Sequence, residues 1–218
     1  MTMRFVHLPG RPARYTSVAR WYDLVSAEPV YVRGRRLAIP LLHLARGDTV
    51  LDVGCGTGLN FALLSEAVGP TGRIVGIDSS AEMLTQAGRR SRGREGPDVV
   101  LRRGDATSLQ PDELLELIGG PVDAVLATYS LSLMSNWRRG FQLVYEVTRP
   151  LGRIAVVDMQ RPTCRLARPF AGIAMAAGGA DPAARPWVAV EETCTDVATP
   201  TLPGAHIQVR VGTRPVLA

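Results

Sequence analysis

The chain has 218 residues, of which 46% are hydrophobic and 21% are charged, a composition typical of one globular domain. All 25 basic residues are arginine, and they outnumber the 20 acidic residues to give a formal net charge of +5. No apolar run approaches the roughly 20 residues that a membrane-spanning helix needs, and no long apolar segment follows Met1 as in a secretory signal. The three cysteines are far apart and lack zinc or redox spacing, which predicts a cytoplasmic protein without a metal site.

The N-terminal segment is rich in arginine. Residues 1–47 hold eight arginines but only two acidic residues, Asp23 and Glu28. Such a segment suits peripheral contact with an anionic membrane or an anionic substrate, and it equally suits a solvated basic face. Nucleic acid is not expected as a partner, because no aromatic residues are interleaved with the arginines and no nucleic-acid module is recognisable.

Two helices are predicted in this segment. Tyr15 and Tyr22 share one face of an amphipathic helix over 14–28. A second helix over 29–39 is expected to end at Pro40. Together they would form a helical cap ahead of the first strand.

From residue 48 onward, strand patterns alternate with helical patterns. Strands are predicted over 48–53, 73–77, 98–103, 122–128 and 153–158. Helices are predicted between them over 59–68, 80–90, 111–118 and 135–149. Ser79 and Glu82 have the spacing of a capping box for the second of these helices, and Gly119 ends the third. The alternation indicates an α/β fold in which helices cover both faces of a mostly parallel sheet.

The C-terminal part departs from this alternation. A helical stretch is expected near 164–177, followed by strand-like segments near 188–198 and 205–213. Apolar and polar residues alternate from His206 to Val211, as in a hairpin strand. We therefore predict a Rossmann-like, seven-stranded sheet that closes with a C-terminal antiparallel hairpin.

A glycine-rich loop follows the first strand of this sheet. Gly54, Gly56 and Gly58 occupy alternate positions, directly after Asp52 and before an apolar helix. Glycine allows tight turns and close approach to a ligand, and the loop amides and the helix N-terminus can receive a carboxylate. Leu59 stands where a dinucleotide-binding loop would place its third glycine, which disfavours an NAD-dependent dehydrogenase.

Two further acids follow the next strands. Asp78 ends the second strand, where a carboxylate can accept hydrogen bonds from vicinal ribose hydroxyls or cap the following helix. Met83 in that helix either packs in the core or borders an adenine. Asp105 and Ala106 follow the third strand, where a Gly-Asp turn explains the same residues without a ligand.

The combination of Asp52, the G-x-G-x-G loop, Asp78 and Asp105 resembles the class I S-adenosylmethionine-dependent methyltransferases over about residues 46–158. The resemblance implies S-adenosylmethionine as cofactor. Its methionine and ribose parts would lie along the loop, and its adenine amino group would bind at Asp105. It also implies one methyltransferase domain over 1–218. This domain would comprise an N-terminal helical cap (1–45), a cofactor-binding core (46–160) and a C-terminal helix and strand pair (161–218).

Two tyrosines are candidates for the acceptor side. Tyr22 lies in an A-x-x-Y-D segment that resembles a signature of quinone and lipid methyltransferases. Tyr129 follows the fourth strand, where it would orient an acceptor, offer its ring to a cationic amine, or simply pack. No general base is evident, and transfer from a sulfonium does not require one.

The sequence leaves three hypotheses for the methyl acceptor. The stretches 129–138 and 151–158 resemble bacterial aminolipid N-methyltransferases, so a lipid head-group amine is the first hypothesis. A quinone or polyketide C- or O-methyltransferase is the second. A cofactor-binding cyclase or binding module that transfers no methyl group is the third. The sequence does not determine the oligomeric state.

Overall fold

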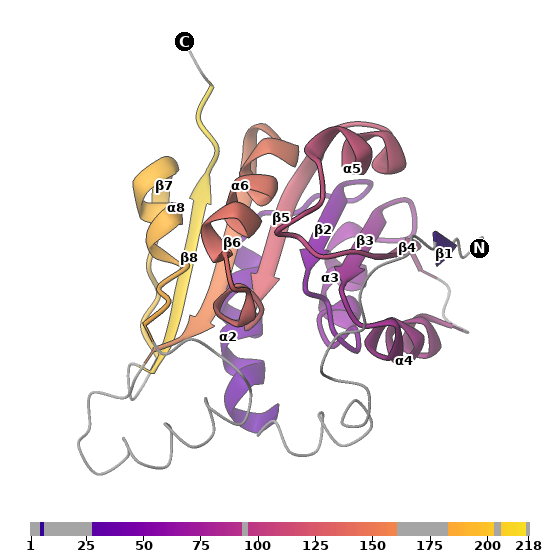
Figure 1. The fold of residues 1–218 in the computed structure, drawn as a ribbon, viewed down its shortest axis with the longest axis horizontal. Coiled ribbons are helices and arrows are strands. Elements are labelled where there is room, and N and C mark those ends of the chain that lie inside the picture. The colour runs from indigo at the N-terminus through magenta and orange to yellow at the C-terminus, as the bar shows by residue number, and fades with distance from the viewer. Residues whose placement is uncertain (1–4, 7–27, 93–95, 161–182, 203–205, 217–218) are drawn as a thin grey trace.

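The computed structural model describes residues 5–6, 28–92, 96–160, 183–202 and 206–216, whose strands form one mixed sheet (Figure 1). The strands are β1 (Phe5–Val6), β2 (Thr49–Val53), β3 (Arg73–Asp78), β4 (Asp98–Arg103), β5 (Val122–Thr128), β6 (Thr148–Met159), β7 (Thr195–Ala198) and β8 (Ile207–Thr213). Their order across the sheet is β1-β4-β3-β2-β5-β6-β8-β7. The predicted seven-stranded sheet is confirmed in β2 to β8, and the two-residue β1 adds an edge strand beside β4.

Strand direction follows the predicted pattern. β8 runs antiparallel to both β6 and β7, whereas the pairs from β1 to β6 are parallel. β3 lies on one side of β2 and β5 lies on the other, so the order of the sheet reverses at β2. In open parallel sheets this reversal opens a crevice at the carboxyl ends of the strands. The fold class expected from the sequence is therefore confirmed.

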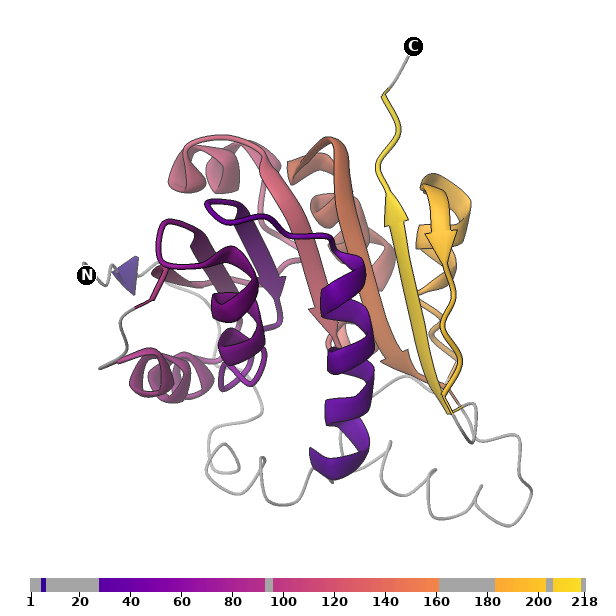
Figure 2. The ribbon, with the colours of Figure 1, turned by 180° about the vertical axis from the view of Figure 1, so that it is seen from behind.

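Helices cover both faces of the sheet (Figure 2). One face is covered by α2 (Glu28–Leu41), α3 (Phe61–Val68) and α4 (Ala81–Ser91). The other face is covered by α5 (Pro111–Ile118), α6 (Trp137–Val147) and α8 (Val188–Thr193). Neighbouring residues of β2 point to opposite faces of the sheet. Val50 packs in the core under α2, α3 and α4, Leu51 packs in the core under α5, α6 and α8, and both are fully buried. Because helices bury both faces of the sheet, its central strands are apolar at consecutive positions, as the sequence predicted.

Two local predictions need correction. The strand expected near 188–198 begins as the helix α8, and only Thr195–Ala198 is extended. Adjacent Ala189 and Val190 are both buried there, which suits a helical face and not the alternation of a half-buried strand. The cap of α4 is Ser80, whose Oγ accepts from the Met83 amide and donates to Glu82, so the cap lies one residue after the predicted Ser79.

The end of one helix also shifts slightly, and one short element was not predicted. α2 continues to Leu41, one residue beyond Pro40, and η1 (Leu131–Leu133) forms a short 3₁₀ turn after β5. The helices predicted over 14–28 and near 164–177 lie outside the described residues.

Candidate functional site

A cavity of about 360 Å³ lies at the carboxyl edge of the sheet, where the strand order reverses. The loops after β2, β3, β4 and β5 line it, and α2 contributes Arg35. Among the residues predicted for cofactor or reaction, the lining includes Gly54, Gly56, Asp78, Met83, Asp105, Ala106 and Tyr129. Asp52 and Gly58 do not line it, and Tyr22 lies outside the described residues.

The glycine-rich loop is held against β3. The amides of Gly54 and Cys55 both donate to the Ile77 carbonyl, at 2.9 and 3.0 Å. Gly56 has a φ of +54°, and a Cβ built on it would meet no atom within 4 Å. This position beside the cavity is thus open on the side where a ligand would approach. Gly58 instead faces Phe61, which a Cβ would meet at 2.8 Å, so its role is packing.

Asp78 ties the loop to the start of α4. Its Oδ2 accepts from the Gly56 amide and its Oδ1 from the Ser80 amide, both at 2.9 Å. Burial raises the pKa of Asp78, while these amide hydrogen bonds oppose the rise. The carboxylate lines the cavity as predicted, and its role with ribose hydroxyls stays a prediction.

Asp52 lies one layer behind the cavity. It is fully buried, and both carboxylate oxygens accept from Asn60 Nδ2, at 3.1 and 3.0 Å. The same nitrogen lies 3.0 Å from Thr128 Oγ1 at the end of β5. Burial raises the pKa of Asp52 to about 7, against the lowering effects of the Asn60 hydrogen bonds and the Arg35 charge. Asp52 therefore joins the loop to β5 through Asn60. Its side chain does not line the cavity.

The side of the cavity predicted for adenine is formed by Met83, Asp105 and Ala106. Met83 and Ala106 are buried, whereas Asp105 is exposed. Asp105 Oδ1 accepts from the amide and the hydroxyl of Thr107, both at 2.8 Å. This is the local turn that the sequence offered as the alternative explanation, and the carboxylate still faces the cavity.

Tyr129 lies against α2 as well as against the cavity. Its hydroxyl donates to the Tyr31 carbonyl at 2.9 Å, and the two rings lie 4.8 Å apart. Arg35 Cζ is 5.5 Å from the centre of the Tyr129 ring. The Tyr129 ring, which the sequence suggested as a partner for a cationic acceptor, therefore already has one cation beside it.

The loop after β5 is fixed by a second buried carboxylate. Asp158, at the end of β6, accepts from the amide and hydroxyl of Ser132 at 3.0 and 2.6 Å, and from the Met159 amide at 2.8 Å. Burial raises the pKa of Asp158 to about 6, and the bonds from Ser132 oppose that rise. Ser130 Oγ donates to the Val53 carbonyl at 2.7 Å, which joins this loop to β2.

Two lining residues were missed by the sequence analysis. Arg35 belonged to the basic segment and carried no separate signal, yet it is 8% exposed while Arg33 and Arg36 are exposed. Its spacing of four residues from Tyr31 would have placed both on one helix face. Asn60 is 2% exposed, and its Oδ1 has no hydrogen-bond partner in the structure. A polar residue between Leu59 and Phe61 in an apolar run was the available signal.

Among the described residues, no group of three or more His, Cys, Asp or Glu side chains is arranged to hold a metal ion. Within the same part of the chain, every helix is too short or too polar to cross a bilayer.

Residues 50–152 match the model of a family described as a methyltransferase domain. The demethylmenaquinone methyltransferase of Oceanobacillus iheyensis is 30% identical over 129 residues, which are 59% of this chain and 52% of that protein. The 2-phytyl-1,4-naphtoquinone methyltransferase of Synechococcus elongatus is 33% identical over 138 residues, 62% of this chain and 56% of that protein. The arsenite methyltransferase of Halobacterium salinarum is 32% identical over 117 residues, 53% of this chain and 28% of that protein. The chain thus matches about half or less of the length of these relatives.

Solved structures share the fold at low sequence identity. A SAM-dependent methyltransferase from Aquifex aeolicus matches 90% of this chain and 97% of its own, with a TM-score of 0.58 and 17% identity. An O-methyltransferase family protein from Burkholderia thailandensis matches 91% of this chain and 57% of its own, with a TM-score of 0.64 and 17% identity.

Proposed function

We propose that this chain is a class I S-adenosylmethionine-dependent methyltransferase that methylates a planar, apolar acceptor of the quinol type. The match of residues 50–152 to a methyltransferase-domain model and the shared fold support the first part of this proposal. The observation that carries the proposal is the cavity at the carboxyl edge, where the glycine-rich loop faces the loop after β5. The first loop offers backbone groups for a cofactor, and the second offers a lipophilic rim for an acceptor.

The cavity fits S-adenosylmethionine on three points. Gly56 leaves open space where any side chain would stand. Asp78 presents a carboxylate already fixed by two amides, which suits vicinal ribose hydroxyls. Asn60 Oδ1 is a buried acceptor without a partner in the structure, which suits the amino group of the methionine part. Asp105, Ala106 and Met83 would surround the adenine.

When bound, S-adenosylmethionine supplies a methyl group that its sulfonium already activates. The chain has to orient the acceptor and exclude water, and no dedicated base is required. Tyr129 and Ser130 face the cavity from the loop after β5, and the hydrogen bonds of Ser130 and Ser132 hold this loop in place. Tyr129 thus stays a candidate for orienting the acceptor.

The rim of the cavity favours an apolar acceptor. Leu133 is 36% exposed and lines the cavity together with Met134 and Leu59. The quinone names of two relatives support the same class. The cavity suits arsenite less well, because soft ions of this kind prefer thiolate ligands. Cys55 is the one cysteine among the described lining residues, and Cys194 packs away from the cavity.

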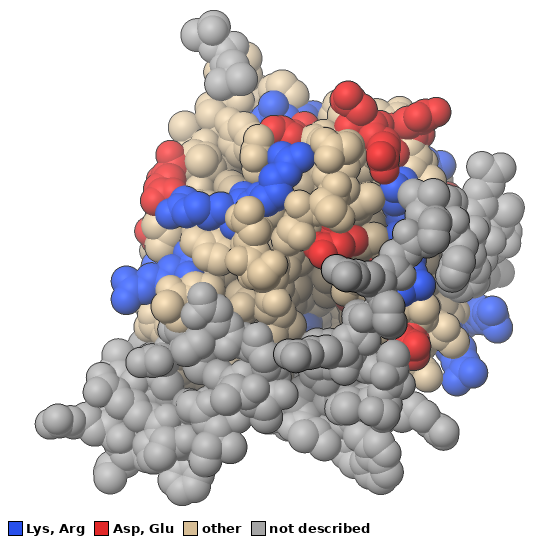
Figure 3. Space-filling model, viewed as in Figure 1, with Lys and Arg blue, Asp and Glu red and all other residues tan. Residues whose placement is uncertain are grey.

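The lipid head-group amine stays the alternative acceptor. A cationic head group would have to approach the ring of Tyr129 beside the guanidinium of Arg35, which repels it. The described part of the surface in Figure 3 shows arginines interspersed with acidic side chains and no continuous basic band on that face. Figure 3 shows one face only, and Arg33, Arg36 and Arg46 of the basic segment are exposed, so peripheral contact with an anionic membrane stays a hypothesis.

The predicted domain division also stays a proposal. β8 lies between β6 and β7 in the same sheet, which supports counting the C-terminal strand pair with the cofactor-binding core as one unit.

The test compares two acceptors with one labelled cofactor. Purified protein is incubated with methyl-labelled S-adenosylmethionine and either a reduced demethylated naphthoquinol or phosphatidylethanolamine vesicles, and the organic extracts are analysed by mass spectrometry. We expect label on the naphthoquinol. Label on the amine alone would contradict the acceptor class, and label on neither would contradict methyl transfer to lipophilic acceptors.

A glycine pair provides the control for the cofactor site. Gly56→Ala should abolish labelling and weaken S-adenosylhomocysteine binding, because the side chain enters the open space at a φ of +54°. Gly119→Ala introduces comparable strain at a φ of +89°, at the C-terminus of α5, and should leave binding unchanged. Equal losses in both variants would mean that backbone strain, and not the site, explains the effect.

A further inference from the structure

Met134 forms part of the cavity wall from the loop after β5. Its side chain is half-buried and packs against the core under α5, α6 and α8. It lines the cavity together with Leu133, on the loop proposed above to meet the acceptor. A thioether also makes favourable contacts with aromatic rings, which suits a planar acceptor.

Gly140 of α6 stands directly behind Met134. Gly140 is buried, and a Cβ built on it would meet Met134 Sδ at 2.8 Å and Leu131 Cδ2 at 3.3 Å. Non-bonded heavy atoms attract best at about 3.5–4.0 Å, so even one methyl group would overlap the thioether. The sulfur therefore rests against bare helix backbone, in a space that only glycine leaves.

This contact explains why glycine occupies position 140. Gly140 lies inside the 11-residue α6, where glycine is about 1 kcal/mol less favourable than alanine. It is not among the glycines with a positive φ, so its backbone conformation does not require glycine. Close packing against the loop after β5 is the remaining physical reason for a glycine here.

The backbone on both sides of the contact is fixed by hydrogen bonds. The Met134 amide donates to the Leu131 carbonyl at 3.0 Å. At the start of α6, the Asn136 carbonyl accepts from the Gly140 amide at 3.2 Å. The side chain of Met134 has three rotatable bonds and is therefore the part that can move when the space at position 140 changes.

The glycine-rich loop meets the loop after β5 at a different residue. A Cβ on Gly54 would meet Ser130 Cβ at 2.4 Å, so Ser130 packs on the loop proposed to hold the cofactor. Met134 follows η1 farther along and packs on α6. Met83, on the side of the cavity predicted for adenine, comes from α4. This division supports assigning Met134 to the acceptor.

We infer that the contact between Gly140 and Met134 sets the width of the acceptor side of the cavity, and thereby the size of the acceptor that the site admits. The inference rests on the proposed methyl transfer to a planar, apolar acceptor and adds a size limit to it. A side chain at position 140 displaces the thioether toward the cavity and narrows the site. Removing the Met134 side chain moves the same wall back and widens it. One methylene in an apolar pocket changes discrimination between ligands by about 10–200-fold, so this contact can decide between ring systems.

The experiment compares two probes of the same chemistry and different size. Naphthol and phenanthrol, aromatic alcohols of two and three fused rings, are titrated by fluorescence against protein saturated with S-adenosylhomocysteine. The readout is the ratio of their dissociation constants. We expect Gly140→Ala to shift this ratio by about tenfold in favour of naphthol, and Met134→Ala to shift it by about tenfold in favour of phenanthrol.

Two further variants serve as controls. Adding Gly140→Ala to Met134→Ala should leave the ratio of the single Met134→Ala variant unchanged, because the overlapping thioether is gone. Gly119→Ala, at the end of α5 and outside the cavity lining, should keep the wild-type ratio. If Gly140→Ala does not fold, the comparison of Met134→Ala with the wild type carries the test alone.

Three results would overturn the inference. One is an unchanged ratio in Met134→Ala. Another is a Gly140→Ala effect that persists in the double variant, which would assign the effect to Leu131. The third is a loss of S-adenosylhomocysteine affinity of about tenfold or more in Met134→Ala, which would place Met134 against the cofactor. Failure of the proposed function is a separate result, since the ratios would then change as expected while no quinol is methylated.

Discussion

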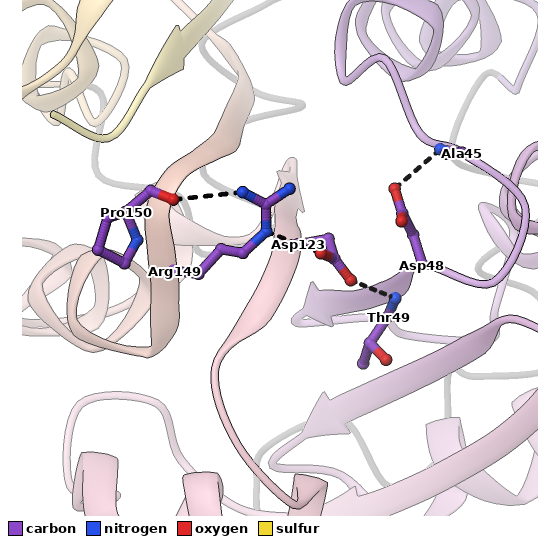
Figure 4. Close-up of polar contacts among 6 residues, drawn as sticks. All are labelled: Ala45, Asp48, Thr49, Asp123, Arg149 and Pro150. Carbon is purple, nitrogen blue, oxygen red and sulfur yellow. Dashed lines mark hydrogen bonds and ion pairs between the residues drawn. The ribbon is translucent and has the colours of Figure 1, made fainter. Parts of the chain in front are cut away.

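The two edges of the sheet hold their carboxylates in different ways. At the amino edge, Asp123 accepts from the Arg149 side chain and from the Thr49 amide, both at 2.8 Å, and so joins the starts of β2, β5 and β6 (Figure 4). Its side chain is 28% exposed and that of Arg149 is 46% exposed. Nearby, Asp48 accepts from the Ala45 amide at 2.8 Å and closes the turn before β2. This edge is held by one partly exposed ion pair and by hydrogen bonds from backbone amides.

At the carboxyl edge, two carboxylates are buried and bonded to neutral donors. Asp52 accepts from Asn60, and Asp158 accepts from Ser132, while both are at most 1% exposed. Burial raises the pKa of each, to about 7 and about 6. Near neutral pH these ionised groups therefore cost stability, whereas the ion pair at the other edge does not carry that burial cost. The cavity thus lies at the edge of the sheet where buried carboxylates lower the stability of the fold near neutral pH.

The largest expected effect is on the pH dependence of stability. Asp52 has an ordinary pKa of 3.8 when unfolded and about 7 in the fold. Its stabilising contribution is thus fully present below pH 4 and is lost as pH rises to 7, because over that range the unfolded state has released the proton that the native state still holds. About three pKa units correspond to roughly 4 kcal/mol. Relative to Asp52→Asn, the wild-type free energy of unfolding should fall by that order between pH 4 and pH 8 in urea titrations.

Asp123→Asn is the matched control at the amino edge. Its pH profile should run parallel to that of the wild type above pH 5, because an exposed ion pair contributes little. Parallel profiles for Asp52→Asn and the wild type would contradict the burial argument and make the two edges electrostatically alike.

The second effect concerns cofactor affinity at the carboxyl edge. Asp78→Ala removes a carboxylate that lines the cavity and that fixes the Gly56 amide. We expect S-adenosylhomocysteine to bind about 10–100-fold more weakly by calorimetry, as for lost hydrogen bonds to a charged group of roughly 1.5–3 kcal/mol. Asp123→Ala should leave the affinity unchanged. Unchanged affinity in Asp78→Ala would mean that the ribose lies elsewhere.

Much of the fold was readable from the sequence because local signals agreed with the tertiary structure. The glycines after β2 are needed wherever a strand turns sharply into a helix beside a ligand, and Gly54 and Gly56 do line the cavity. Asp78 and Asp105 follow strands that end at the same edge of a parallel sheet, so their proximity follows from topology. At these positions the spacing of the glycines, the place of the acids at strand ends and the resemblance to the methyltransferases led to the prediction.

The rest depended on packing between distant segments. Arg35 is one of several arginines in its segment, and only the contact of α2 with the loop after β5 distinguishes it from the exposed Arg36. Asp52 was predicted beside the cofactor, but Asn60 stands between it and the cavity. Ala189 and Val190 fit a strand or a helix equally in sequence, and the helical face of α8 against the sheet decides.

The smallest effect should come from the ion pair at the amino edge. Asp123→Asn removes the charge that attracts Arg149 while keeping an oxygen that can accept from the Thr49 amide. We expect the free energy of unfolding in urea to fall by about 0.5 kcal/mol at low salt, and the difference to vanish near 1 M NaCl, where charges on the surface are screened. Asp123→Ala also removes the acceptor of the Thr49 amide and should cost about 1 kcal/mol more at every salt concentration. A loss of several kcal/mol in Asp123→Asn, independent of salt, would show that this carboxylate behaves like a buried one, and the contrast between the two edges would then lie in their donors and not in their exposure to water.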